Sequence, residues 1–176
     1  MCTIPRAHER ASKPERRTAL KNPPAPVRLE IRYSDLDPCG HINNAVYLAY
    51  LEQVRLGYWR SLADLADIEK LEAGDIPGAR YVMAETNLRF KAPVFFGDAL
   101  HGAATVPWVG NRSFAMNFEL RTGESFETGE LACEGSAAHV FFDPVKDGVQ
   151  PRPDWFLQAV ATLEGRPEGD FAPPER

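Results

Sequence analysis

The sequence RYSDLDPCGHINNAVYL, from Arg32 to Leu48, contains the most informative pattern in this chain. Its first half is rich in turn-forming and helix-capping residues, including Pro38 and Gly40, and its second half is apolar. Apolar residues then continue at steps of one, three and four as far as Leu65, which predicts one long helix. Because that helix is apolar around much of its circumference, other elements must wrap around it.

Segments with strand patterns lie on both sides of this helix. Residues 27–33 alternate apolar and polar side chains, which is typical of a half-buried strand. Four further strands, separated by turn residues, are expected after the helix at 80–91, 98–107, 112–121 and 128–142. Their short connections predict a four-stranded antiparallel meander, and a last amphipathic helix is expected at 154–163. The predicted fold class is α+β, with one antiparallel sheet around one long central helix.

The length of 176 residues suits a single domain, which we expect to span residues 27–163. Residues 1–26 hold six Lys or Arg against two Glu and few large apolar side chains, so a flexible basic tail is predicted there. Residues 164–176 are rich in Pro, Gly and charge, and a flexible C-terminal tail is expected. An open sheet leaves unpaired backbone groups on its outer strands, so we expect a homodimer or a homotetramer.

Composition excludes several classes of protein. Without the basic tail the chain carries a net charge of −9, which argues against nucleic acid as a partner. The longest apolar run, Ala45–Leu51, is too short to cross a membrane. Three widely spaced cysteines favour a reducing compartment, so a cytoplasmic location is expected. We find no phosphate loop, dinucleotide fingerprint or metal motif in the sequence, so neither a metal nor a cofactor is expected.

The stretch quoted above resembles a motif of the acyl-CoA thioesterases of the 4-hydroxybenzoyl-CoA thioesterase type. That motif reads aromatic-x-Asp-x-Asp-x-x-Gly-His-(Val/Ile)-Asn-Asn-x-x-Tyr-Leu. Residues 89–93, Gly97–Asp98 and residues 141–144 also match the family in order and spacing. The resemblance covers residues 27–163 and implies the hot-dog fold. It also implies hydrolysis of an acyl-CoA thioester to a carboxylic acid and coenzyme A.

The resemblance places the catalytic carboxylate of the family at Asp37 rather than at Asp35. A thioester has a good leaving group, because the pKa of a thiol is about 8.5, so the reaction mainly needs a nucleophile or base and a place for the oxyanion. An aspartate can attack the carbonyl or activate a water molecule. Backbone amides around Asn44, at the helix start, can stabilise the oxyanion. His41 can orient the carboxylate, polarise water or brace the loop.

Some of these residues also have an ordinary structural interpretation. Asp37 also suits a simple turn position before a proline, and Asn43 and Asn44 suit helix-capping positions. Glu52 resembles a helix acid that some hot-dog thioesterases use, but it also suits an exposed ion pair. Cys39 stands where the similar plant acyl carrier protein thioesterases carry asparagine, which argues against an acyl carrier protein substrate. We do not expect Cys39 to be the nucleophile.

Four polar residues are candidates for binding the phosphates of coenzyme A: Arg89, Lys91, Arg112 and Ser113. They lie at expected strand ends near the Gly97 and Gly110 turns and would form one rim there. Tyr47 is expected in the core or in the pocket wall. Two other functions fit the same motif, a hot-dog enoyl-CoA hydratase and an acyl-CoA-binding protein without catalytic activity.

Overall fold

The computed structural model describes residue 20 and residues 23–67 and 79–174. Its strands are β1 (Val27–Leu29), β2 (Tyr81–Phe90), β3 (Leu100–Thr105), β4 (Ser113–Thr122), β5 (Glu130–Asp143) and β6 (Gly148–Val149). Its helices are α1 (Tyr47–Leu65) and α2 (Asp154–Glu164), with short 3-10 helices η1 (Tyr33–Asp35), η2 (Asn44–Val46) and η3 (Glu168–Phe171). The helix η2 continues directly into α1, so the predicted long helix is confirmed.

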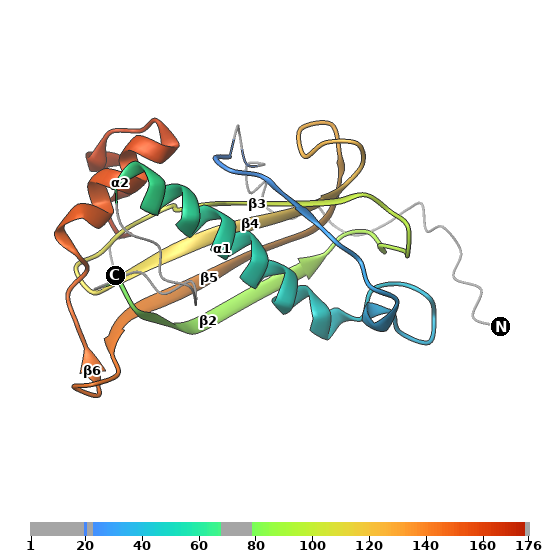
Figure 1. The fold of residues 1–176 in the computed structure, drawn as a ribbon, viewed down its shortest axis with the longest axis horizontal. Helices are drawn as coiled ribbons and strands as arrows, with labels where there is room; N and C mark the ends of the chain where they lie inside the picture. The colour runs from blue at the N-terminus through green and yellow to red at the C-terminus, as the bar shows by residue number, and fades with distance from the viewer. Residues whose placement is uncertain (1–19, 21–22, 68–78, 175–176) are drawn as a thin grey trace.

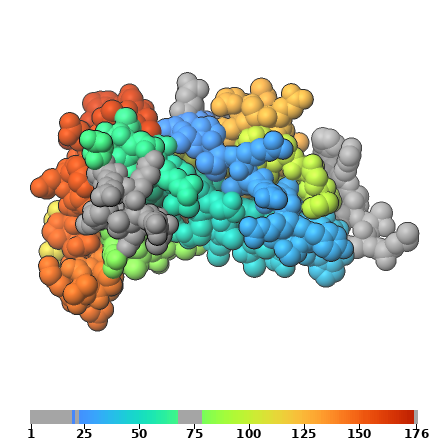
Figure 2. Space-filling view, viewed as in Figure 1, coloured from blue at the N-terminus to red at the C-terminus, as the bar shows by residue number. Residues whose placement is uncertain are grey.

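The main sheet is antiparallel and has the strand order β1-β3-β4-β5-β2, with β6 paired to β5. Figure 1 shows α1 lying across one face of this sheet. The α+β class with a sheet curled around a central helix is therefore confirmed. Figure 2 shows that the blue segment before the helix and the teal helix lie side by side on one face of the molecule.

The predicted meander of four strands is wrong in one respect. Strands β3, β4 and β5 do form a meander, but β2 pairs with β5 at the far edge of the sheet, and β1 takes the place beside β3. Residues 91–99 connect β2 to β3, and such a segment is longer than the usual hairpin loop of two to five residues. It therefore carries the chain from the edge strand β2, past β5 and β4, to β3.

The core lies between α1 and the sheet. Alternate residues of β4 point toward the helix and are at most 2% exposed: Phe114, Met116, Phe118 and Leu120. The helix comes very close to the sheet at Gly102, where an added Cβ would collide with side-chain atoms of Val54 and Leu120. Glycine at this position therefore permits the close approach of helix and sheet.

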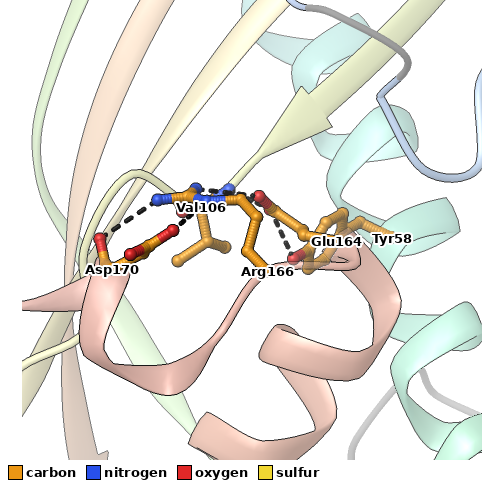
Figure 3. A network of polar contacts seen from close by, with 5 residues as sticks. All are labelled: Tyr58, Val106, Glu164, Arg166 and Asp170. Carbon is orange, nitrogen blue, oxygen red and sulfur yellow. Dashed lines mark hydrogen bonds and ion pairs between the residues drawn. The ribbon is translucent and has the colours of Figure 1, made fainter.

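The C-terminal segment packs on the body of the protein (Figure 3). The carboxylate of Glu164 accepts hydrogen bonds from the Tyr58 hydroxyl at 2.9 Å and from the Val106 amide. It also pairs with Arg166 at 3.3 Å, and the Arg166 guanidinium lies 4.3 Å from the centre of the Phe171 ring. Phe171 is 1% exposed. The segment as far as Phe171 thus makes packing contacts that the polar composition of residues 164–176 does not indicate.

Most of the predicted basic tail lies outside the described residues. Of the part that is described, the Leu20 amide donates a hydrogen bond to Glu119 at 2.8 Å, and Pro23 is buried. None of the described helices is long and apolar enough to span a membrane.

Candidate active site

A tight turn carries the candidate catalytic residues. The Asp37 carbonyl accepts a hydrogen bond from the Gly40 amide at 3.0 Å, and the Asp37 amide donates one to the His41 carbonyl at 2.9 Å. The residue order Asp-Pro-Cys-Gly is the one that type I turns favour. Gly40 has a φ of +84°, in the left-handed region that glycine adopts at little cost. The turn reverses the chain and places Asp37 and His41 opposite each other.

The side chains of Asp37 and His41 are in direct contact. Asp37 Oδ2 lies 3.0 Å from His41 Nδ1, and the other carboxylate oxygen, Oδ1, accepts a hydrogen bond from the Cys39 amide at 2.8 Å. Both side chains remain partly exposed, Asp37 at 21% and His41 at 24%. The carboxylate is therefore held in a fixed orientation yet stays open to a ligand, and His41 Nε2 is left for a second hydrogen bond.

The neighbouring acid, Asp35, has a structural role. Its Oδ2 accepts hydrogen bonds from the Tyr50 hydroxyl and the Arg32 amide, both at 2.8 Å. Its carbonyl accepts one from the Asn43 amide at 2.9 Å. Burial and the bond to Asp35 hold the pKa of Tyr50 well above its ordinary value. Asp35 therefore ties the turn to α1, which leaves Asp37 as the acid that contacts His41.

The helix start lies next to this turn. Asn43 caps η2, because its Oδ1 accepts a hydrogen bond from the Ala45 amide at 3.0 Å. The capping role considered for the Asn43–Asn44 pair thus falls to Asn43. Asn44 is the first residue of the helix and is exposed, and within the described residues its amide has no hydrogen-bond acceptor. The helix start thus presents this amide as an unpaired donor among the described residues.

A cavity of about 250 Å³ opens at the same place. Four predicted site residues line it, His41, Asn44, Tyr47 and Lys91, and they are joined by Ile42, Phe90, Ala92 and Pro93. Tyr47 is 2% exposed, and its ring lies edge-on to the Phe90 ring with 4.9 Å between the ring centres. Burial raises the pKa of Tyr47 to about 12, so its hydroxyl stays protonated near neutral pH.

The predicted phosphate rim is not assembled within one chain. Lys91 and Arg89 lie together at the end of β2 and pair with Glu134 at 2.9 and 3.9 Å. Arg112 and Ser113 lie at the start of β4, which is the opposite end of the sheet. Phe90 pairs with Cys133, whereas Ser113 pairs with Val140. Because Cys133 and Val140 both lie on β5, their separation places Phe90 and Ser113 roughly 23 Å apart along the strands.

A larger cavity, of about 510 Å³, lies on the other side of the sheet. Its lining includes Asn117, Glu119 and Ser136, whose positions alternate with the core-facing positions of β4 and β5. The smaller cavity is the better candidate site, because it holds His41 and the helix start.

Two side chains near the site were not singled out from the sequence. Phe95 forms a backbone bridge with His41, and its ring lies edge-on to the imidazole at 6.5 Å. Phe90 lines the cavity, and both phenylalanines are nearly half exposed. For Phe95 the available signal was the pair Phe95–Phe96 between Pro93 and Gly97, and for Phe90 it was the match of residues 89–93 to the family. Glu52 forms an ion pair with Arg55 and is 55% exposed, which fits its plainer interpretation.

The turn also brings together three groups of metal-ligand type. One ligand atom each of Asp37, Cys39 and His41 lies within 4.8 Å of the other two. Their alternate spacing differs from that of the common metal-binding motifs, which is why the sequence predicts no metal here.

The curled sheet, the long central helix and the polar turn at its start define a protein of the hot-dog thioesterase class. The model of the family described as the thioesterase-like superfamily matches residues 31–160, and the chain belongs to that superfamily. Among curated proteins, no sequence matches this chain significantly.

Solved structures agree with this fold. A thioesterase from Thermus thermophilus, solved with coenzyme A and Zn, is 27% identical over 84% of this chain and 99% of its own, with a TM-score of 0.69. A thioesterase superfamily protein from Jannaschia sp. is 24% identical over 80% and 83% of the two chains, with a TM-score of 0.65. A 1,4-dihydroxy-2-naphthoyl-CoA thioesterase from Synechocystis is 16% identical over 79% and 96%, with a TM-score of 0.62.

Proposed function

We propose that this protein is an acyl-CoA thioesterase in which Asp37 is the nucleophile or general base. The observation that carries the proposal is the contact of 3.0 Å between Asp37 Oδ2 and His41 Nδ1, next to the cavity at the helix start. Membership of the thioesterase-like superfamily supports it. The Thermus structure with coenzyme A and the Synechocystis enzyme for an aromatic acyl-CoA support this class of substrate.

In the proposed reaction the thioester carbonyl lies beside Asp37, with its oxygen toward the Asn44 amide. Direct attack by Asp37 forms a mixed anhydride and expels coenzyme A as a thiolate, and water then hydrolyses the anhydride. In the second route Asp37 removes a proton from a water molecule, which attacks the carbonyl. Both routes place negative charge on the carbonyl oxygen, which the helix amide stabilises. His41 holds the carboxylate in position through Nδ1.

The two routes differ in the source of one oxygen atom. Under single turnover in ¹⁸O water, direct attack followed by attack of water on the Asp37 side of the anhydride places an oxygen of Asp37 in the product acid and leaves the label on the protein. Attack of water on the acyl side would label the acid, as water activation does, so label on Asp37 is the result that identifies direct attack. Water activation places the label in the product acid in the first turnover. Mass spectrometry of the acid and of the peptide that contains Asp37 distinguishes them.

Lys91 is the proposed contact for the phosphates of coenzyme A, because it lines the cavity, and Arg89 adds positive charge nearby. Arg112 and Ser113 can join them only from a second copy of the chain. Strand β2 is an edge strand whose Val82 and Met83 are more than 40% exposed, which favours pairing with a second copy. We therefore propose a homodimer as the functional unit. Sedimentation equilibrium tests this, and a monomer at the concentrations of the activity assay would contradict it.

A panel of acyl-CoA thioesters tests the proposed activity. The panel includes short, long, branched and aromatic acyl groups, and released thiol is measured with a chromogenic disulfide. We expect turnover of at least one member. Saturable binding, seen as a thermal shift, without thiol release would instead indicate an acyl-CoA-binding protein. Loss of enoyl absorbance with crotonyl-CoA and no thiol release would indicate a hydratase.

A further inference from the structure

We propose that Asp37, Cys39 and His41 form a binding site for Zn²⁺, and that the bound ion inhibits the enzyme. One ligand atom from each residue lies within 4.8 Å of the other two. A carboxylate oxygen, a thiolate sulfur and an imidazole nitrogen are all ligands that Zn²⁺ accepts, at about 2.0–2.3 Å. Two atoms bound to one tetrahedral ion then lie roughly 3.3–3.8 Å apart, so only small side-chain movements are needed to close the site.

The local backbone explains why alternate residues converge here. The turn from Asp37 to His41 is closed by the hydrogen bond between the Asp37 amide and the His41 carbonyl. The Cys39 amide is bound to Asp37 Oδ1, which keeps the middle of the turn close to the carboxylate. The turn thus holds the three ligands together before any ion arrives, which lowers the entropic cost of binding.

Exposure and charge also suit a divalent cation. Cys39 is exposed, while Asp37 and His41 are partly exposed, so an ion can enter from solvent and keep a water molecule as its fourth ligand. A carboxylate and a thiolate together neutralise the two charges of Zn²⁺. Binding releases the thiol proton of Cys39 to solvent, so affinity should rise with pH.

The inhibitory effect rests on the proposed function. The atoms in the close contact between Asp37 and His41, Oδ2 and Nδ1, are the ones that the ion would take. An Asp37 carboxylate bound to Zn²⁺ has lost much of its strength as a nucleophile or base. Cys39 has no part in the proposed hydrolysis, so it contributes to metal binding alone. Substitution of Cys39 should therefore separate the two properties.

Co²⁺ binding tests the site without reference to activity. The full chain is treated with a chelator and titrated with Co²⁺, and we expect the near-ultraviolet absorption of a thiolate bound to cobalt. Cys39→Ala and Cys39→Ser should abolish this absorption and weaken Zn²⁺ binding, measured by competition, at least about tenfold. Cys2→Ala, the matched control, should leave both unchanged. The same spectrum and the same Zn²⁺ affinity in wild type and both Cys39 variants would overturn the site.

Inhibition is then measured with the acyl-CoA that the panel identifies. Zn²⁺ should inhibit the wild type, and Cys39→Ala should keep its activity without metal but need at least about tenfold more Zn²⁺ for the same inhibition. Equal sensitivity of the two proteins would overturn the inhibitory role of the site. If no acyl-CoA is hydrolysed, the proposed function fails while the cobalt titration still decides the metal site.

Discussion

The carboxylates of Asp35 and Asp37 lie two residues apart on one loop and have different partners. Asp35 Oδ2 accepts a hydrogen bond from the Tyr50 hydroxyl at 2.8 Å, whereas Asp37 Oδ2 contacts His41 Nδ1 at 3.0 Å. The first contact ties the loop to α1. The second joins Asp37, which is partly exposed, to His41, which lines the cavity at the helix start. This difference separates a structural acid from a candidate catalytic one.

The positioning role of His41 predicts a graded loss of turnover. His41→Ala removes the contact with Asp37, so kcat should fall about 10- to 100-fold with a smaller change in KM. His41→Asn should recover part of the loss, because the asparagine amide can donate to Asp37 from nearly the same place as Nδ1. Steady-state kinetics of the three proteins measures this. Equal losses in both variants would argue that His41 acts through Nε2 instead.

Acid should destabilise the protein through His139. This residue is fully buried, and burial, together with the charge of Arg55, lowers its pKa to about 3. Its folded-state pKa thus lies below the unfolded value of about 6.5, so its contribution to stability is complete above that value and is lost as the pH falls toward 3. Between about pH 7.5 and about pH 5.5 this loss amounts to about 1.4 kcal/mol.

Urea unfolding at those two pH values checks this prediction. In His139→Phe the aromatic ring that stacks on Phe114 is kept while the titrating group is removed. The variant should lack this part of the pH dependence, whatever its absolute stability. An unchanged difference between the two pH values would show that His139 is not the group responsible.

Glu164 should anchor the C-terminal segment. Glu164→Ala leaves the Tyr58 hydroxyl and the Val106 amide without their acceptor, which should cost about 1–3 kcal/mol of unfolding free energy. Glu164→Gln keeps an acceptor oxygen and should cost less. Chemical unfolding of the two variants tests this, and equal losses would assign the effect to the ion pair with Arg166.

Glu164 should make the protein less stable as the pH rises. A carboxylate in a surface ion pair has the opposite effect. Burial raises the pKa of Glu164 above its ordinary value despite its hydrogen bonds. The folded state therefore binds the proton more tightly than the unfolded state, and this contribution to stability falls as the pH rises through the interval between the two pKa values. Glu164→Gln should remove that component from the pH profile of unfolding.

The close approach of α1 and β3 predicts a large effect of one methyl group. Gly102→Ala places a Cβ against Val54 and Leu120 and should cost about 1–3 kcal/mol. Gly169→Ala is the matched control, because an added Cβ there meets no atom within 4 Å. Thermal unfolding should show a clear loss for the first variant and little change for the second. A tolerated Gly102→Ala would mean that the helix can move away from the sheet.

Local signals predict the long helix, the turn before it and most strands, because each depends on residues close in sequence. Either β1 or β2 could pair with β3, and the periodicity of each segment does not show that β1 takes this place. Phe171 was missed for a related reason. Its carbonyl accepts a hydrogen bond from the Val109 amide, far away in sequence, and the polar segment around it looks flexible when taken alone.

The candidate site was partly predictable. The motif contributes His41, Asn44 and Tyr47 to one cavity, and Lys91 joins them from the end of β2. The sequence could not show that Arg112 and Ser113 lie at the other end of the sheet, because that follows from strand register. The convergence of Asp37, Cys39 and His41 was also hidden, since it depends on the backbone path of the turn.

Replacement of Asp37 is the most direct test of the proposed function. Asp37→Asn keeps the size of the side chain and an acceptor for the Cys39 amide, so the fold should be retained, as checked by thermal unfolding. Glu130→Gln, an exposed acid at the start of β5, is the matched control. With the best acyl-CoA of the panel, kcat of Asp37→Asn should fall about 10²- to 10⁴-fold while Glu130→Gln keeps wild-type activity. A folded Asp37→Asn variant with wild-type turnover would contradict the account.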